Sequence, residues 1–178
     1  MRAFLFGALA TLPIGVAADV SEVAQQQIID EAQEFSAALL SGDGIEHSIS
    51  RTFEPYAETA ARQLNLPSTQ DLYDAMRLGY AQSKELVEVV EHNVQADGAV
   101  FGENGPLKWG IVPFTSQIKY LETAEILPRE CNSYLVFGFG GEWFVQTRDA
   151  FSDQILQATM PGFTFLNEPS PPCSAPAS

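Results

Sequence analysis

The sequence contains few of the residues that build metal centres. Its 178 residues include only two cysteines and two histidines, which is too few for the Cys/His ligand sets of structural zinc. His47 has Asp43 and Glu46 nearby, but a single histidine in a polar loop is a poor metal site. We therefore predict no metal site and no cofactor.

Positive charge is also scarce. Nine Lys and Arg residues stand against 23 Asp and Glu residues, and the formal net charge is −14. The basic residues are scattered, so they form no stripe that could follow a nucleic acid, and an anionic membrane surface would repel the chain. We predict no nucleic-acid partner and attribute the acidity to solubility.

Long apolar runs are absent except at the N-terminus. Arg2 precedes the apolar residues 3–16, and small residues end at Ala18, as in a secretory signal peptide. This run is too short to span a membrane as a helix. We predict a signal peptide over residues 1–18, a periplasmic or extracellular location and no membrane span.

Catalytic motifs are missing as well. There is no Gly-x-Ser-x-Gly sequence, which would mark a nucleophile elbow. The glycines at 138, 140 and 141 are followed by Glu142 and Trp143, whereas a phosphate loop needs Lys and Ser or Thr after its glycines. The sequence therefore predicts no catalytic residue, and we interpret Gly140-Gly141 as a hairpin turn.

The two cysteines present are Cys131 and Cys173. In an oxidising compartment such a pair is expected to form a disulfide, and the alternative is two free thiols. Residues 167–178 are rich in Pro, Ser and Ala, which predicts a disordered tail. The disulfide would attach this tail to the loop at residues 127–132.

Helical periodicity dominates the first half of the chain. Ile28, Ala32 and Phe35 share one face of a first helix, which glycines at 41–44 end. A turn at 45–53 is expected to lead to Pro55, in the first turn of a second helix.

A third helix is expected after Ser68, whose spacing to Asp71 resembles a capping box. Leu72 and Met76 share its apolar face. Gly79 lies in the middle of this helix, where glycine is unfavourable, and we attribute it to close packing.

The period changes to two from about residue 85. Residues 85–95 and 108–120 are predicted to be extended, and Pro113 predicts a bend, a bulge or an edge position. Residues 133–147 are predicted to form a hairpin whose first strand is apolar on both faces, as in a central strand. Asp149 is expected to cap a short final helix.

Three helices, about four antiparallel strands and a short helix indicate an α+β fold. We predict a single domain over residues 19–166, in which the N-terminal helices pack against a curved, cone-like antiparallel sheet.

This order resembles the NTF2-like (cystatin-like α+β barrel) superfamily. Within it, "WGIVPFTSQIKY" (109–120) and "SYLVFGFGGEWFVQT" (133–147) are similar to a group of uncharacterised bacterial secreted proteins. The matching positions are Trp109, Ile111, Val112, Pro113, Lys119, Ser133, Gly141, Trp143 and Phe144. The cysteine-containing loop at 127–132 departs from that group. The matching residues look structural, so the resemblance implies a fold and no particular activity.

A ligand of such a fold would bind inside the cone. The candidate pocket residues are His92, Tyr56, Tyr80, Phe114 and Phe137. His92 has the strand parity of Val90 and Val94, so it is expected to point inward. Its simplest role is that of a hydrogen-bonded wall residue, and the alternative is a general acid or base.

Three functions stay open at this point. The first is a binding or accessory module that holds a small apolar ligand or a protein partner. The second is a pocket enzyme of the isomerase or hydrolase type that uses His92 and a tyrosine. The third is a structural homodimer that associates through the outer face of the sheet. We favour the first, because the sequence offers no evident acid/base pair.

Overall fold

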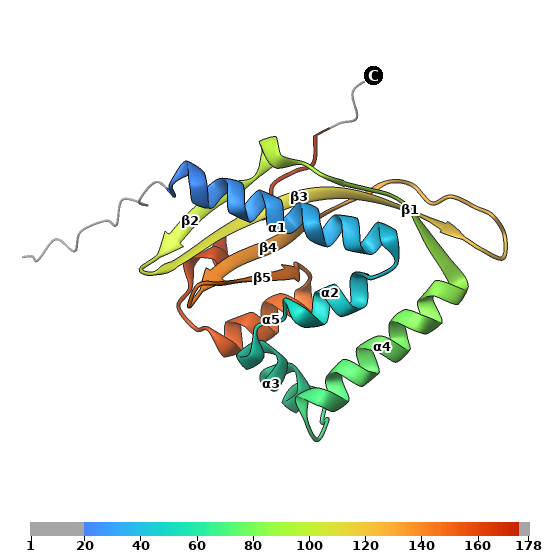
Figure 1. The fold of residues 1–178 in the computed structure, drawn as a ribbon, viewed down its shortest axis with the longest axis horizontal. Coiled ribbons are helices and arrows are strands. Elements are labelled where there is room, and N and C mark those ends of the chain that lie inside the picture. The colour runs from blue at the N-terminus through green and yellow to red at the C-terminus, as the bar shows by residue number, and fades with distance from the viewer. Residues whose placement is uncertain (1–19, 175–178) are drawn as a thin grey trace, which may run out of the picture.

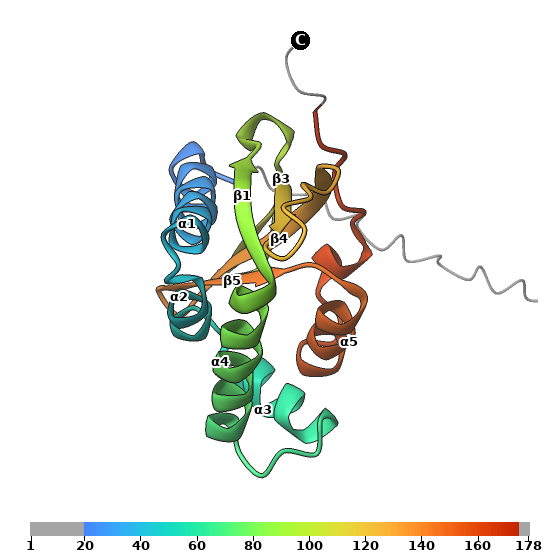
Figure 2. The ribbon, with the colours of Figure 1, turned by 90° about the vertical axis from the view of Figure 1, so that its right-hand side faces the viewer.

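The computed structural model describes residues 20–174 as an α+β fold with helices on both sides of one curved antiparallel sheet (Figures 1 and 2). The helices are α1 (Glu22–Ser41), α2 (Gly44–Ser50), α3 (Glu54–Gln63), α4 (Thr69–Leu86), α5 (Ala150–Thr159) and the 3-10 helices η1 (Ala96–Gly98) and η2 (Thr164–Asn167). The strands are β1 (Val87–Val94), β2 (Val100–Asn104), β3 (Leu107–Tyr120), β4 (Glu130–Phe139) and β5 (Glu142–Thr147). The predicted signal peptide lies outside the described residues.

The predicted C-terminal end of the first helix and the predicted start of the helix after Ser68, which is α4, are confirmed. Gly42 ends α1 in the left-handed region, with φ 90°, and its N–H is directed to the Leu39 carbonyl, as is common at helix C-termini. At the start of α4, the Ser68 hydroxyl accepts a hydrogen bond from the Asp71 N–H.

The predicted turn at 45–53 is wrong in its first part, because α2 occupies Gly44–Ser50. A Cβ at Gly44 would lie 2.5 Å from Leu39 Cδ2. The missing side chain therefore lets the chain turn back closely on α1 and pack a further helical segment there. Local sequence gives little sign of this helix, because contact with α1 positions it.

The irregularity predicted at Pro113 is confirmed. β1 and β2 follow one another along the same edge of β3, and η1 separates them opposite Pro113. The Pro113 carbonyl accepts a hydrogen bond of 2.8 Å from the Gln95 N–H. Proline has no N–H to offer a neighbouring strand, and the interruption between β1 and β2 falls where that bond would have been made.

A bulge in β1 decides which way His92 points. The register of β1 against β3 shifts between Val89 and Glu91, so Val90 is an extra residue that faces solvent. His92 is buried, which confirms the expected inward direction. The assumption that it shares its face with Val90 is wrong, because a bulge reverses the alternation of side chains.

The predicted hairpin and central strand are confirmed. Gly140 and Gly141 have φ values of 65° and 90°, which a two-residue turn between β4 and β5 requires. Tyr134 on one face of β4 and Leu135 on the other are both fully buried. Both sides of β4 are therefore covered, as expected for a strand in the middle of a sheet.

Two hydrophobic cores lie on the two faces of the sheet, and Figure 2 shows α1 and α5 on its opposite sides. We name them the α1 core and the α3–α5 core. The α1 core consists of Ile28, Ala32, Phe35, Val112, Phe114, Tyr134, Val136 and Val145. The α3–α5 core consists of Tyr56, Ala57, Ala60, Ala61, Leu72, Leu107, Trp109, Ile111, Leu135, Phe137, Ile155, Leu156, Met160 and Phe165.

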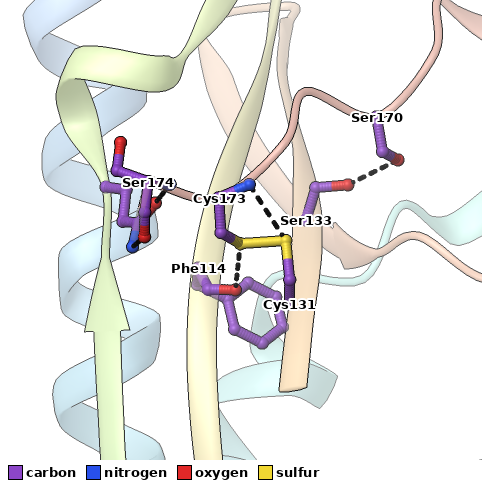
Figure 3. Close-up of a disulfide and its surroundings, with 7 residues drawn as sticks. Phe114, Cys131, Ser133, Ser170, Cys173 and Ser174 are labelled. Carbon is purple, nitrogen blue, oxygen red and sulfur yellow. Dashed lines mark hydrogen bonds between the residues drawn. A yellow bond between two sulfur atoms is a disulfide. The ribbon is translucent and has the colours of Figure 1, made fainter. Parts of the chain in front are cut away.

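The predicted disulfide between Cys131 and Cys173 is present (Figure 3). It holds the segment after η2 against β4, where the hydroxyls of Ser170 and Ser133 are 2.8 Å apart. The Cys173 sulfur lies 3.2 Å from the Phe114 carbonyl oxygen of β3. The segment is therefore tied to two adjacent strands.

Candidate functional site

His92 is the centre of a buried polar network that joins three elements. Its Nδ1 atom lies 2.8 Å from the Ser36 hydroxyl on α1, and its Nε2 atom lies 2.8 Å from the Tyr134 hydroxyl on β4. The Ser36 hydroxyl also donates to the His92 carbonyl oxygen at 3.2 Å. The network therefore ties α1 to both an edge strand and the central strand.

These contacts are all satisfied by one tautomer of a neutral imidazole. Since Ser36 gives its proton to the His92 carbonyl, its oxygen accepts the Nδ1–H. The Nε2 atom then carries no proton and accepts the Tyr134 hydroxyl. Each of the three side chains has its polar atoms paired, as buried polar groups require.

The electrostatics also favour a structural role for His92. Burial lowers its pKa to about 4, and burial raises the pKa of Tyr134. The imidazole stacks on Phe114, with ring centroids 4.5 Å apart. A general base needs a nitrogen that can reach a substrate, and both nitrogens of His92 are occupied by the protein itself.

The five candidate pocket residues are distributed over three places. Tyr56 and Phe137 belong to the α3–α5 core, and the gap that they line leaves no room for a water molecule. His92 and Phe114 lie together on the other side of the sheet. Tyr80 lies on α4, where its hydroxyl donates to the Gly42 carbonyl at 3.3 Å.

The polar residues around His47 are engaged with other partners. The His47 ring packs edge-on against Phe35, with centroids 5.6 Å apart. The Glu46 carboxylate forms an ion pair with Arg77, with an N–O distance of 2.7 Å. Within residues 20–174, no three His, Cys, Asp or Glu side chains are grouped so that they could hold a metal ion.

A cleft of about 440 Å³ lies between the end of α1, α4 and the start of β1. We name it the α1–α4 cleft. Its aliphatic lining consists of Leu39, Leu40, Val87, Val89 and Leu121, and its polar lining consists of Ser41, Tyr80, Ser83, Lys84 and Glu88. Leu40 is 51 % exposed and Leu121 is 46 % exposed. Large apolar side chains are therefore open to solvent on both sides of the cleft.

The α1–α4 cleft exists because α4 leaves the body of the fold (Figure 1). Leu72 is buried near its start, whereas Leu78 is 61 % exposed. A Cβ at Gly79 would meet no atom within 4 Å, so the prediction that close packing explains Gly79 is wrong.

None of the helices in the described part of the chain is long and apolar enough to cross a membrane.

The positive charge in the cleft, on Lys84, interacts with other residues that line the cleft. The Lys84 ammonium lies 5.6 Å from the centroid of the Tyr80 ring, a cation–π distance. It also lies beside the C-terminal end of α1, since a Cβ at Gly42 would be 3.1 Å from Nζ. A cation is favoured at the negative end of a helix dipole. Lys84 therefore has a structural role, and the aliphatic lining is left for a ligand.

Sequence reasoning expected Tyr80 in a pocket inside the cone, and it missed the aliphatic lining of the α1–α4 cleft. Leu40 and Leu121 are far apart in the chain, and each reads as an ordinary apolar residue at the end of a helix or strand. Their exposure follows from the path of α4, which no local pattern predicts. Ser36 and Tyr134 were likewise missed as partners of His92, from which they are 56 and 42 residues away.

Comparison of the chain with models of known families, with curated proteins and with solved structures found no match. The packing of N-terminal helices on a curved antiparallel sheet is compatible with an NTF2-like fold (Figure 1). A compatible fold indicates no reaction, because one fold carries many functions.

Proposed function

We propose that the protein is a non-catalytic binding module that holds a small apolar ligand in the α1–α4 cleft. The observation that carries this proposal is a cleft of about 440 Å³ with five aliphatic lining residues. Small-molecule sites are typically clefts of about 300–1,000 Å³ that are lined mostly by apolar side chains with a few polar groups.

The exposed leucines supply the driving force. Burying a fully exposed leucine side chain gains about 1.5–3 kcal/mol, and about half of that is available at Leu40 and Leu121, which are already half buried. Leu40 and Leu121 both line the cleft, so a ligand between them would cover apolar surface on each side. Tyr80 and the serines at the rim offer hydroxyls that orient a polar end of the ligand.

The two other functions receive less support. An enzyme using His92 would need that imidazole in an open site, but its nitrogens bond to Ser36 and Tyr134. A homodimer formed through the outer face of the sheet would need an open apolar face. Along β4, Leu135 and Phe137 on that face are already covered by the α3–α5 core.

We also propose that the chain is a distant member of the NTF2-like superfamily, similar to a group of bacterial secreted proteins, and is exported. The order of helices and strands supports the first part. The Cys131–Cys173 disulfide supports the second, because disulfides persist in oxidising compartments. Mass spectrometry of the protein from its native host tests export. A chain that starts at Asp19 supports it, and a chain that retains Met1 to Ala18 contradicts it.

Binding to the cleft is tested with N-phenyl-1-naphthylamine, a neutral apolar probe whose fluorescence rises in an apolar site. We expect saturable binding of one probe per chain. Leu121→Asp places a charge in the cleft and should weaken binding about tenfold or more, equivalent to about 1.4 kcal/mol or more.

Leu64→Asp is the matched control. Leu64 is 48 % exposed, close to the value for Leu121, but it ends α3 outside the cleft. Binding should be unchanged in this variant. Equal losses in the two variants, or no binding by the wild type, would contradict the proposal. Native mass spectrometry of the protein from its host then identifies the natural ligand.

A further inference from the structure

Both tryptophans are paired across the sheet with a glycine. Trp109 is opposite Gly102, and Trp143 is opposite Gly138. A Cβ at Gly102 would lie only 2.3 Å from the Trp109 ring. A Cβ at Gly138 would lie 3.0, 3.1 and 3.2 Å from three adjacent atoms of the Trp143 six-membered ring. These nearly equal distances show that the Trp143 ring lies flat over the glycine.

The two tryptophans differ in what covers them. Trp109 is buried and packs against Phe165 of η2, with centroids 5.9 Å apart. Trp143 is half-buried at the margin of the α1 core, and no aromatic ring within residues 20–174 packs against it. It lines a groove of about 290 Å³ instead. Each tryptophan ring is thus a flat platform supported by a glycine. The Trp109 platform is covered by Phe165, whereas the Trp143 platform is open to the groove.

The open platform lies between two hairpin turns. The groove is lined by Trp143, Lys108, Glu142, Gln27 and Pro106, together with the main chain of the glycines at 138, 140 and 141. Figure 1 shows the β2–β3 and β4–β5 turns at the same end of the molecule as the start of α1. We name this site the hairpin groove.

We propose that the hairpin groove binds a neutral sugar ring that stacks on Trp143. A sugar ring has a flat face of C–H groups, which suits an indole face. Its rim of hydroxyls needs both donors and acceptors. The Gln27 amide provides both, the Lys108 ammonium donates, and the Glu142 carboxylate accepts. A few such polar groups around an apolar platform fix the orientation of a ligand.

The charge of the protein favours a neutral sugar over an anionic ring, and the position of the hairpin groove separates it from the α1–α4 cleft. A net charge of −14 disfavours a nucleotide or another anionic ring. The hairpin groove is also distinct from the α1–α4 cleft. Gln27 and Leu39 lie on the same helix, and their separation along the axis is about 18 Å at about 1.5 Å per residue. The two sites can therefore be tested independently.

The test is NMR titration with maltotriose, chitotriose and xylotriose, observed at the two indole N–H signals. Trp143→Phe assigns the signals. At least one saccharide should shift the Trp143 signal saturably and leave the Trp109 signal in place. Gln27→Ala, a change at an exposed helix position, should weaken that binding several-fold.

Gln26→Ala is the matched control, because Gln26 is also exposed on α1 but does not line the groove. Its affinity should equal that of the wild type. The proposal is overturned if none of the three saccharides shifts the Trp143 signal, if the Trp109 signal responds instead, or if the two glutamine variants bind equally.

Discussion

On one face of the sheet, the His92 ring bonds to the Ser36 hydroxyl of α1 through one nitrogen and to the Tyr134 hydroxyl through the other, so the core there contains a hydrogen-bonded network. On the other face, aliphatic and aromatic side chains fill the core, and Tyr56 makes only a long contact of 3.4 Å to Ser152. The α3–α5 core therefore depends mainly on filled volume, whereas the α1 core also depends on complete hydrogen bonding. The α3–α5 core should therefore be more sensitive to substitutions that remove volume. The α1 core should be more sensitive to substitutions that remove a single polar atom.

The largest effect is expected from Phe165→Ala in the α3–α5 core. Phe165 is fully buried and touches Trp109, Phe137 and Phe163. Removing its ring should lower the free energy of unfolding by about 3–5 kcal/mol, through lost burial and the cavity left behind. Urea unfolding measures this loss. Phe163→Ala is the control, because Phe163 is only partly buried and should lose less stability. Equal losses in the two variants would show that η2 does not close the α3–α5 core.

A smaller effect is expected from Tyr134→Phe in the α1 core. The change removes one oxygen and leaves His92 Nε2 buried without its donor. An unsatisfied buried acceptor costs about 1–3 kcal/mol. The matched change on the other face is Tyr56→Phe, which should cost less, because its hydroxyl makes only the long contact to Ser152. Similar losses in the two variants by urea unfolding would contradict the contrast between the faces.

The smallest effect is expected from the contribution of His92, beside the α1 core, to the dependence of stability on pH. The pKa of His92 falls from 6.5 to about 4 in the folded protein, so the unfolded chain binds the extra proton between these values. Stability should therefore decrease as pH falls through this window. The full shift corresponds to about 3 kcal/mol, and partial solvent screening reduces the expected loss to about 1–2 kcal/mol.

His92→Gln isolates this contribution. Urea unfolding of both proteins at several pH values should give a smaller loss on acidification for the variant. Burial raises the pKa of Glu31, so the contribution of Glu31 to stability increases as pH falls. Both proteins contain Glu31, so its contribution cancels when the wild type and the variant are compared. Parallel stability curves would show that His92 does not titrate below its usual range.

The parts of the fold that were predicted correctly carry local chemical signals. Gly140-Gly141 permits the turn between β4 and β5, and the Asp149 side chain caps α5 through the Ser152 N–H. The features that were missed depend on tertiary contacts. α2 forms against Leu39 because Gly44 has no side chain, and the bulge at Val90 is fixed by pairing with β3.

The candidate sites were less predictable than the fold for the same reason. The inward direction of His92 was predicted, but from a parity with Val90 that the bulge breaks, and its partners come from α1 and β4. The α1–α4 cleft results from the direction of a whole helix. Gly138 was recognised as part of a hairpin, yet its role beneath Trp143 becomes visible only when the cross-strand pairs are known.

The interruption between β1 and β2 has a further consequence for the behaviour of the protein at high concentration. A long, regular outer strand is a template on which another molecule can add its own strand and begin a fibril. Here η1 and the bulge at Val90 break that template. The irregularity opposite Pro113 thus protects the sheet against aggregation through the edge formed by β1 and β2.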